Sequence, residues 1–261
     1  MHDRHYLVFL LFSGLFGAQV GSFLNVCIYR LPRHESVAWP GSHCPTCSHA
    51  IAWYDNIPII SYAVLLGHCR HCGVRIPVRY PGIEILNALG YMGILWCFGF
   101  TWGTVAYWAL YSSLLVVAGT DLSHKIIPNV ITFPGIVLGL ISAGTILPLG
   151  LVNGFIGLLV GGGILWLLAW ASPYLFGKEG MGGGDIKLLA MIGAFLGWKP
   201  AVMTIMLGSF LGSVVGVALI ASKVIRREDY IPFGPFLVCG ALVSLFFGQS
   251  LLDWYQSLLA G

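Results

Sequence analysis

Charged residues are scarce in this sequence, and their scarcity indicates the class of protein. Only 9% of the 261 residues are charged and 57% are hydrophobic, whereas roughly 25% of the residues of an ordinary soluble domain are charged. The formal net charge of +3 is small and the aromatic residues are spread through apolar runs, which argues against nucleic-acid binding. The composition therefore predicts a polytopic membrane protein.

Several sequence motifs of known enzyme chemistry are also missing. Neither GxSxG nor HExxH occurs, so the signatures of serine hydrolases and of one class of zinc hydrolases are absent. Residues 30–83 form the only polar segment large enough to be a subdomain, and they contain no predicted strand followed by a glycine-rich turn. Nothing in these residues indicates a nucleoside-binding fold.

Charge-free runs mark the membrane-spanning segments. Residues 5–29 form the first, and a cleaved signal peptide is the competing interpretation; the run is long for that and its amino end is weakly basic. The other runs are 85–120 with a turn near 101–103, 126–177 with a break at 148–150, the run after Asp185, 200–222 and 230–252. Because 85–120 and 126–177 are each long enough for two helices, we expect an all-α protein with about eight transmembrane helices.

The distribution of basic residues predicts the orientation. When the spans alternate, 11 of the 13 Lys and Arg residues lie on one side, and only Arg4 and Lys199 lie on the other. Positive charge marks the cytoplasmic face. We therefore expect a first transmembrane helix in 1–29, a cytoplasmic subdomain in 30–83, and a membrane-embedded domain of seven helices in 84–261.

Four cysteines of the polar segment have the spacing of a metal site. Two CxxC pairs, separated by 21 residues, are formed by Cys44, Cys47, Cys69 and Cys72. Four thiolates in two knuckles predict a closed tetrahedral Zn²⁺ site, and a small polar segment needs such a staple because it can bury little core. Redox chemistry and unliganded thiols are the alternatives. Neighbouring histidines could substitute as ligands: His43, His49, His68 and His71.

Two aspartates stand where membrane helices begin or end. Only 11 uncharged residues separate Lys187 from Lys199, so a helix of spanning length must start at or before Asp185. Asp121 ends another apolar run, and by parity it lies on the same side of the membrane. Asp185 could be a helix N-cap, and Asp121 a solvated helix end beside Lys125. Capping explains neither the second aspartate on the same side nor the three preceding glycines, which allow positive φ and a close backbone approach.

Two carboxylates that share a site divide into a charged and a protonated group. Such a pair can act as general base and general acid in peptide hydrolysis by an activated water. An ion-coupled transporter that uses the pair as a proton relay, and a membrane scaffold built on the zinc subdomain, are the alternatives from other classes.

Several segments resemble one family. The GxGD pattern of Gly182-Gly183-Gly184-Asp185 is similar to that of membrane-embedded aspartyl proteases, in particular the bacterial type IV prepilin leader peptidases. The resemblance extends over nearly the whole chain and includes Gly21–Val26 with Arg30–Pro32, the CxxC pairs, Arg79–Pro81 with Glu84 and Asn87, Asp121 with Ile127–Pro128, Lys178–Ala190 and Pro232–Pro235.

The resemblance implies a bifunctional enzyme of the bacterial inner membrane with its active site facing the cytoplasm. Such proteins cut the leader of type IV prepilins or type II secretion pseudopilins after a glycine, and then methylate the new amino terminus with S-adenosylmethionine. By resemblance Asp121 and Asp185 are the catalytic aspartates, and the residues that bind S-adenosylmethionine are not identified. A peptidase without methylation is the alternative. The substrates' identities and the oligomeric state are left open.

Five further positions support this site in the prediction. Gly182 and Gly184 allow close packing beside Asp185, and Lys187 is expected to snorkel, since it does not share the helix face of Asp185. His124 could reach Asp121 on a continuing helix. For Glu84, an electrostatic role near a helix start and a role in methyl transfer or leader recognition both remain open.

Overall fold

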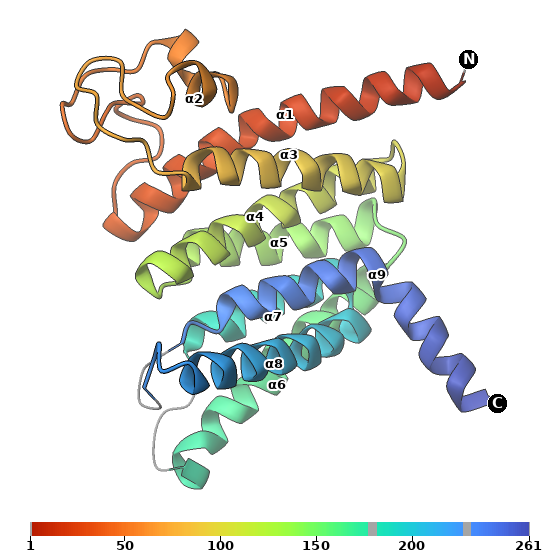
Figure 1. Ribbon diagram of the computed structural model, residues 1–261. Helices are drawn as coiled ribbons and strands as arrows, with labels where there is room; N and C mark the ends of the chain where they lie inside the picture. Colours follow the sequence, from red (N-terminus) through yellow and green to blue (C-terminus); the bar gives the residue numbers. More distant parts are fainter. Residues whose placement is uncertain (1, 177–181, 227–230, 261) are drawn as a thin grey trace. The chain divides into compact units, whose positions relative to one another are not determined.

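The computed structural model describes residues 2–176, 182–226 and 231–260 (Figure 1). These residues contain helices and two isolated β-bridges but no strand, as an all-α chain requires. The chain divides into two compact units, Met1–Val116 and Val117–Gly261. The boundary lies within one helix, and each unit has its own packing.

In the described part of the chain, eight apolar helices occupy the predicted runs. They are α1 (His2–Arg30), α3 (Arg79–Phe98), α4 (Trp102–His124), α5 (Asn129–Thr145), α6 (Leu151–Phe176), α7 (Gly183–Leu196), α8 (Trp198–Ala221) and α9 (Gly234–Ala260). Six of them are long and apolar enough to cross a membrane. With 17 and 14 residues, α5 and α7 are about 26 Å and 21 Å long, less than the roughly 30 Å hydrocarbon core. The protein is a multi-pass membrane protein, and the predicted count of eight spans is approximate.

In the first unit, α1 and α3 pack closely because α1 carries glycines on one face. A Cβ atom on Gly17 would lie 2.9 Å from the Cα of Ala88, and one on Gly21 would lie 2.8 Å from the Cα of Glu84. The buried Asn87 side chain donates a 2.7 Å hydrogen bond to the Gly17 carbonyl. Helix packing of this kind relies on small residues where lipid gives no hydrophobic drive.

The cysteine-bearing segment joins α1 to α3. It contains two short 3-10 turns, Leu31–Arg33 and Trp53–Asn56, and the five-residue helix α2 (Ile60–Val64). Figure 1 shows this segment beside the carboxyl end of α1 and the amino end of α3. It is the largest non-helical part of the described chain, as its prolines and charges predict.

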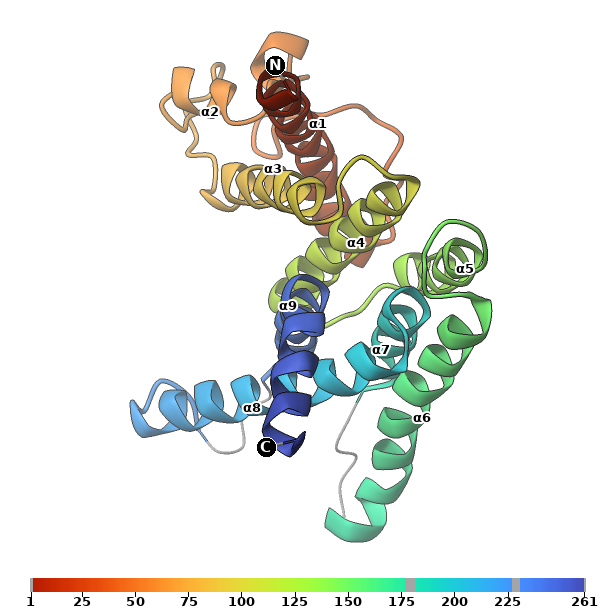
Figure 2. The same cartoon turned by 90° about the vertical axis from the view of Figure 1, so that its right-hand side faces the viewer.

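In the second unit, α7 is the central helix. All residues from Leu188 to Phe195 are buried, and α5, α6, α8 and α9 all contact this helix. Figure 2 shows α5, α6 and α7 side by side. Gly157 of α6 and Gly193 of α7 face each other so closely that a Cβ on either would collide with the other's backbone. This packing holds the start of α7, and Asp185 with it, in a fixed position.

Candidate active site and metal centre

Asp121 lies in the last turn of α4 and is 3% exposed. Its Oδ2 atom accepts a 3.0 Å hydrogen bond from the backbone N–H of Gly234, the first residue of α9. A carboxylate is favoured there because the free N–H groups give a helix a partial positive charge at its amino end. The start of α9 therefore holds Asp121 in place.

Asp185 lies in the first turn of α7 and is 4% exposed, so the helix does start before it, as predicted. Gly182 is the N-cap residue, and the Asp185 carboxylate hydrogen-bonds the Gly182 backbone N–H. Asp185 thus contributes to capping, though not as the N-cap. The charge of Asp121 is near enough to act on Asp185, although the two buried residues are 64 positions apart in the sequence.

Ile127 fills the space between the three segments that form this site. A Cβ on Gly184 would lie 2.9 Å from the Ile127 Cβ, and a Cβ on Gly234 would lie 2.6 Å from Asp121 Oδ2 and 3.4 Å from Ile127 Cδ1. Glycine at both positions lets the amino ends of α7 and α9 approach Asp121. Neither Ile127 nor Gly234 was predicted as a site residue, although both belong to motifs that carried the resemblance.

The glycines before Asp185 act by their size. Gly182 has φ −77° and the next two residues are helical, so these glycines do not use the positive φ that glycine allows. A Cβ on Gly183 would meet no atom within 4 Å, and one on Gly182 would be at an ordinary 3.7 Å from Asp185 Oδ2. Gly184 is the crowded position. The preceding residues of this motif, 178–181, lie outside the described part of the chain.

Lys187 and His124 lie near the aspartates but contact other groups. Lys187 Nζ donates a 2.8 Å hydrogen bond to Asn129 Oδ1 of α5, and it lies 5.3 Å from the centroid of the Phe133 ring. Lys187 therefore ties α7 to α5. His124 is the last residue of α4, and its buried Nδ1 atom has no hydrogen-bond partner among the described residues. Its proposed contact with Asp121 stays a prediction.

The four predicted cysteines come together in the first unit. The Sγ atoms of Cys44, Cys47, Cys69 and Cys72 all lie within 4.8 Å of one another, and those of Cys44 and Cys72 are 3.8 Å apart. Hydrogen bonds, first of all from the backbone N–H of Cys47, lower the pKa of Cys44 to about 6. A thiol that ionises readily is suited to metal ligation, and the cluster could hold a metal ion.

The two knuckles repeat the same backbone turn. Ser48 accordingly donates its N–H to the Cys44 carbonyl, and Gly73 donates its N–H to the Cys69 carbonyl. Both residues have positive φ, 57° and 68°, and a β-bridge closes each knuckle, His43 with Ala50 and His68 with Arg75. Equivalent residues of the two knuckles are 25 positions apart in the sequence, and the two pairs of thiols lie around one point.

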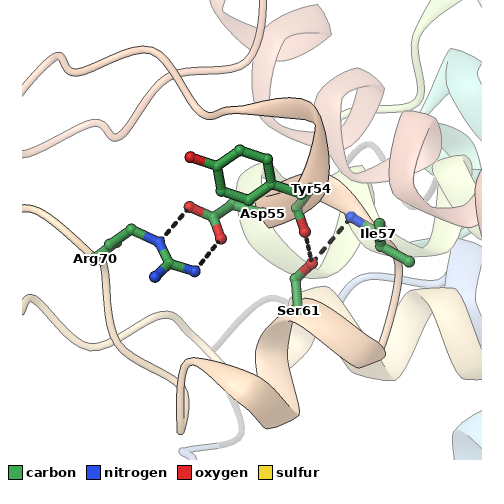
Figure 3. Close-up of polar contacts among 5 residues, drawn as sticks. All are labelled: Tyr54, Asp55, Ile57, Ser61 and Arg70. Atoms are coloured by element: carbon green, nitrogen blue, oxygen red, sulfur yellow. Dashed lines mark hydrogen bonds and ion pairs between the residues drawn. The ribbon is translucent and has the colours of Figure 1, made fainter.

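Polar contacts connect the second knuckle to the rest of its segment (Figure 3). Arg70 donates from Nε to Asp55 Oδ2 at 2.8 Å and from Nη2 to Oδ1 at 2.6 Å. The hydrogen bonds and positive charge of Arg70 hold the pKa of Asp55 below its usual value. Ser61 donates to the Tyr54 carbonyl and accepts from the Ile57 N–H. These hydrogen bonds stabilise the segment independently of the thiols.

Glu84 lies in the first unit, on the second turn of α3, and only 8% of it is exposed. Its Oε2 atom accepts a 2.8 Å hydrogen bond from the Ile59 backbone N–H, just before α2. Its neighbours therefore belong to the cysteine-bearing segment and to α1.

Comparisons with known proteins match two successive parts of the chain. Residues 15–98 match the profile of the bacterial peptidase A24 N-terminal domain, and residues 108–217 match that of the type IV leader peptidase family. A protein of Pseudomonas aeruginosa named prepilin leader peptidase/N-methyltransferase is 36% identical, over 96% of this chain and 94% of its own length. Proteins of the same name from Aeromonas salmonicida and Burkholderia pseudomallei are 36% and 35% identical, over 97% and 92% of this chain and 96% and 85% of their own lengths. No solved structure matches the chain significantly.

Proposed function

The chain belongs to the type IV leader peptidase family, and on that premise we propose that it removes the leader from type IV prepilins or type II secretion pseudopilins and then methylates the new amino terminus. In this proposal Asp121 and Asp185 perform the hydrolysis. The observation that carries it is that two carboxyl groups, both at least 96% buried, lie near enough for the charge of Asp121 to act on Asp185.

The proposed hydrolysis uses the pair as base and acid. Two carboxylates that share a site hold one proton between them more readily than they carry two negative charges. The ionised carboxylate takes a proton from a water molecule as its oxygen attacks the scissile carbonyl carbon. The protonated carboxyl donates a hydrogen bond to the carbonyl oxygen and then gives its proton to the leaving amine. The N–H groups of Gly234 and Gly182 hold the two carboxyl groups in place during these steps.

We propose that the chain lies in the bacterial inner membrane with the aspartates at the cytoplasmic side. The 11-to-2 distribution of basic residues supports this orientation. In this proposal residues 84–261 are the protease domain, and residues 30–83 are the cytoplasmic region that takes part in methylation. S-adenosylmethionine would supply an activated methyl group.

We also propose that the four cysteines bind a structural Zn²⁺. A tetrahedral ion with Zn–S bonds of about 2.3 Å separates its sulfur ligands by about 3.8 Å, and the Cys44 and Cys72 Sγ atoms are 3.8 Å apart. Four thiolates leave no open position for a reacting group. The ion would act as a staple for a segment with little buried core.

Metal analysis tests this staple. We expect about one zinc ion per chain, and we expect Cys69→Ser to lose the zinc and lower the melting temperature because the ion no longer joins the knuckles. Cys97→Ser is the matched control, since Cys97 is an exposed cysteine of α3, and it should keep the zinc. A Cys69→Ser protein with full zinc content would contradict the assignment.

The proposed function as a whole is tested with a purified prepilin. The protein is incubated with the substrate, with and without S-adenosylmethionine, and the new amino terminus is analysed by mass spectrometry. We expect cleavage under both conditions and the added mass of a methyl group only with the donor. Cleavage without added mass would reduce the function to that of a peptidase, and intact substrate would contradict both activities.

A further inference from the structure

A cavity of about 420 Å³ lies in the first unit, between the carboxyl half of α1, the amino end of α3 and the cysteine-bearing segment. This volume falls in the range of about 300–1,000 Å³ of small-molecule and cofactor sites. Its walls are mostly apolar and include the rings of Tyr29, Tyr62 and Tyr80. Its lining residues all belong to the first unit, whereas Asp121 and Asp185 belong to the second.

Asn25 brings an unused hydrogen-bond acceptor to this cavity. Its side chain is 2% exposed and lines the wall. The Nδ2 atom donates to the carbonyls of Tyr80 and Gly21, at 3.0 and 3.4 Å. The Oδ1 atom is buried and has no partner among the described residues. An unsatisfied buried acceptor costs about 1–3 kcal/mol, so a ligand donor that reached it would remove a penalty.

Glu84 brings a carboxylate to the same cavity. It accepts hydrogen bonds from the Ile59 N–H and from the Ser22 hydroxyl, which are both neutral groups. Ile59 has φ 67° and ψ −50°, and the Ile60 N–H bonds back to the Pro58 carbonyl at 2.6 Å. This is a strained γ-turn for a β-branched residue, and strained backbone of this kind concentrates at ligand and active sites.

Hydrogen bonds hold the outer wall of the cavity in place. Arg30, which is 6% exposed, donates to the carbonyls of Ser36 and Gly41 and so fastens the chain that leaves α1. On the opposite wall the Arg70–Asp55 pair connects the second knuckle to the turn before α2. The cavity is therefore formed before any ligand binds.

We propose that this cavity binds S-adenosylmethionine, with the positively charged part of the donor facing Glu84. The inference rests on the proposed methylation and adds its binding site. The donor carries a sulfonium and an ammonium group, which match the carboxylate of Glu84, and its adenine suits a lining that is mostly apolar and includes three tyrosines. Charge-assisted hydrogen bonds of this kind are the strongest available to such a site.

The test is calorimetric titration of S-adenosylmethionine into the purified full-length protein in the absence of any pilin. We expect Glu84→Gln to weaken binding at least about tenfold, the effect of losing one charged contact. Val26→Phe, which fills the cavity from α1, should abolish detectable binding without altering any charge. Glu35→Gln and Val8→Phe are the matched controls, because both residues are exposed and neither lines the cavity; both should bind as the wild type does.

The outcomes separate this inference from the function it rests on. If the wild type binds the donor and both cavity variants bind it equally well, the cavity assignment is wrong and the proposed methylation stands. If the wild type does not bind the donor, the methylation proposal fails as well. If the variants lose methylation but keep full affinity, the cavity receives the pilin amine instead, which also overturns the assignment. Thermal unfolding of each variant verifies that it is folded.

Discussion

Replacing either Asp121 or Asp185 by asparagine is expected to slow prepilin cleavage by about 10² to 10⁴-fold, the usual contribution of a general acid or base. Asparagine preserves the volume of each side chain and can still accept the hydrogen bond from Gly234 or Gly182. It cannot exchange a proton with water or the leaving amine. The loss should therefore appear in the catalytic step, and each variant should insert into the membrane as the wild type does. The rates are measured with a tagged prepilin by gel or mass spectrometry.

Asp253→Asn is the control for the loss of an acidic group. Asp253 is an exposed residue near the end of α9, where its Oδ1 accepts a hydrogen bond from Gln249. This variant should cleave at the wild-type rate. Wild-type cleavage by the Asp121 or the Asp185 variant would eliminate the proposed pair.

Replacement by alanine should slow cleavage at Gly184 but not at the adjacent Gly183. A Cβ on Gly184 would lie 2.9 Å from the branched Cβ of Ile127, which cannot rotate away, so α7 or the chain after α4 must shift. A displacement of about 1 Å in a catalytic group can cost about 10²-fold in rate, and we expect a cleavage loss of that order for Gly184→Ala.

Gly183→Ala should keep the wild-type rate, because the added Cβ meets no atom within 4 Å. The same replacement in the first turn of α7 can even stabilise the helix, since alanine loses less conformational freedom than glycine. The comparison uses the same cleavage assay, with melting temperatures measured for both variants. Equal losses at the two positions would mean that the whole glycine run is needed for another reason, and that contact with Ile127 is not the cause.

The helices could be predicted from the sequence because the bilayer imposes a simple rule. A charged side chain in hydrocarbon is expensive, so the charge-free runs and the helices nearly coincide: the predicted break at 148–150 falls between the end of α5 and the start of α6. The lengths of the helices could be predicted less well than their positions. Helix α7 begins at Gly183 and therefore includes two charged residues, Asp185 and Lys187. Lys187 is accommodated because its Nζ atom bonds Asn129.

The candidate site was only partly accessible to sequence analysis. The cysteine cluster is encoded by spacing along the chain, and the structure brings the four thiols together as expected. The roles of Ile127 and Gly234 depend on contacts between segments 57 to 113 positions apart, which no local pattern reports. The unsatisfied Asn25 oxygen and the turn at Ile59 are likewise tertiary features. GxGD identified the motif, but only the packing distinguishes Gly184 from Gly183.

The measurement that tests the central claim most directly is cross-linking of the two aspartate positions. Asp121→Cys and Asp185→Cys are combined in a chain whose Cys27, Cys97 and Cys239 are replaced by serine, and a short bifunctional thiol reagent is added. Asn129→Cys with Lys187→Cys is the positive control, because these side chains are in contact. Asp121→Cys with Leu196→Cys is the negative control, since Leu196 lies about 16 Å further along α7.

If the two carboxyl groups share one site, peptides that join α4 to α7 should be recovered from the aspartate pair as efficiently as from the positive control. Recovery no higher than that of the Leu196 pair, with the positive control cross-linked, would contradict a shared site and with it the proposed hydrolytic mechanism.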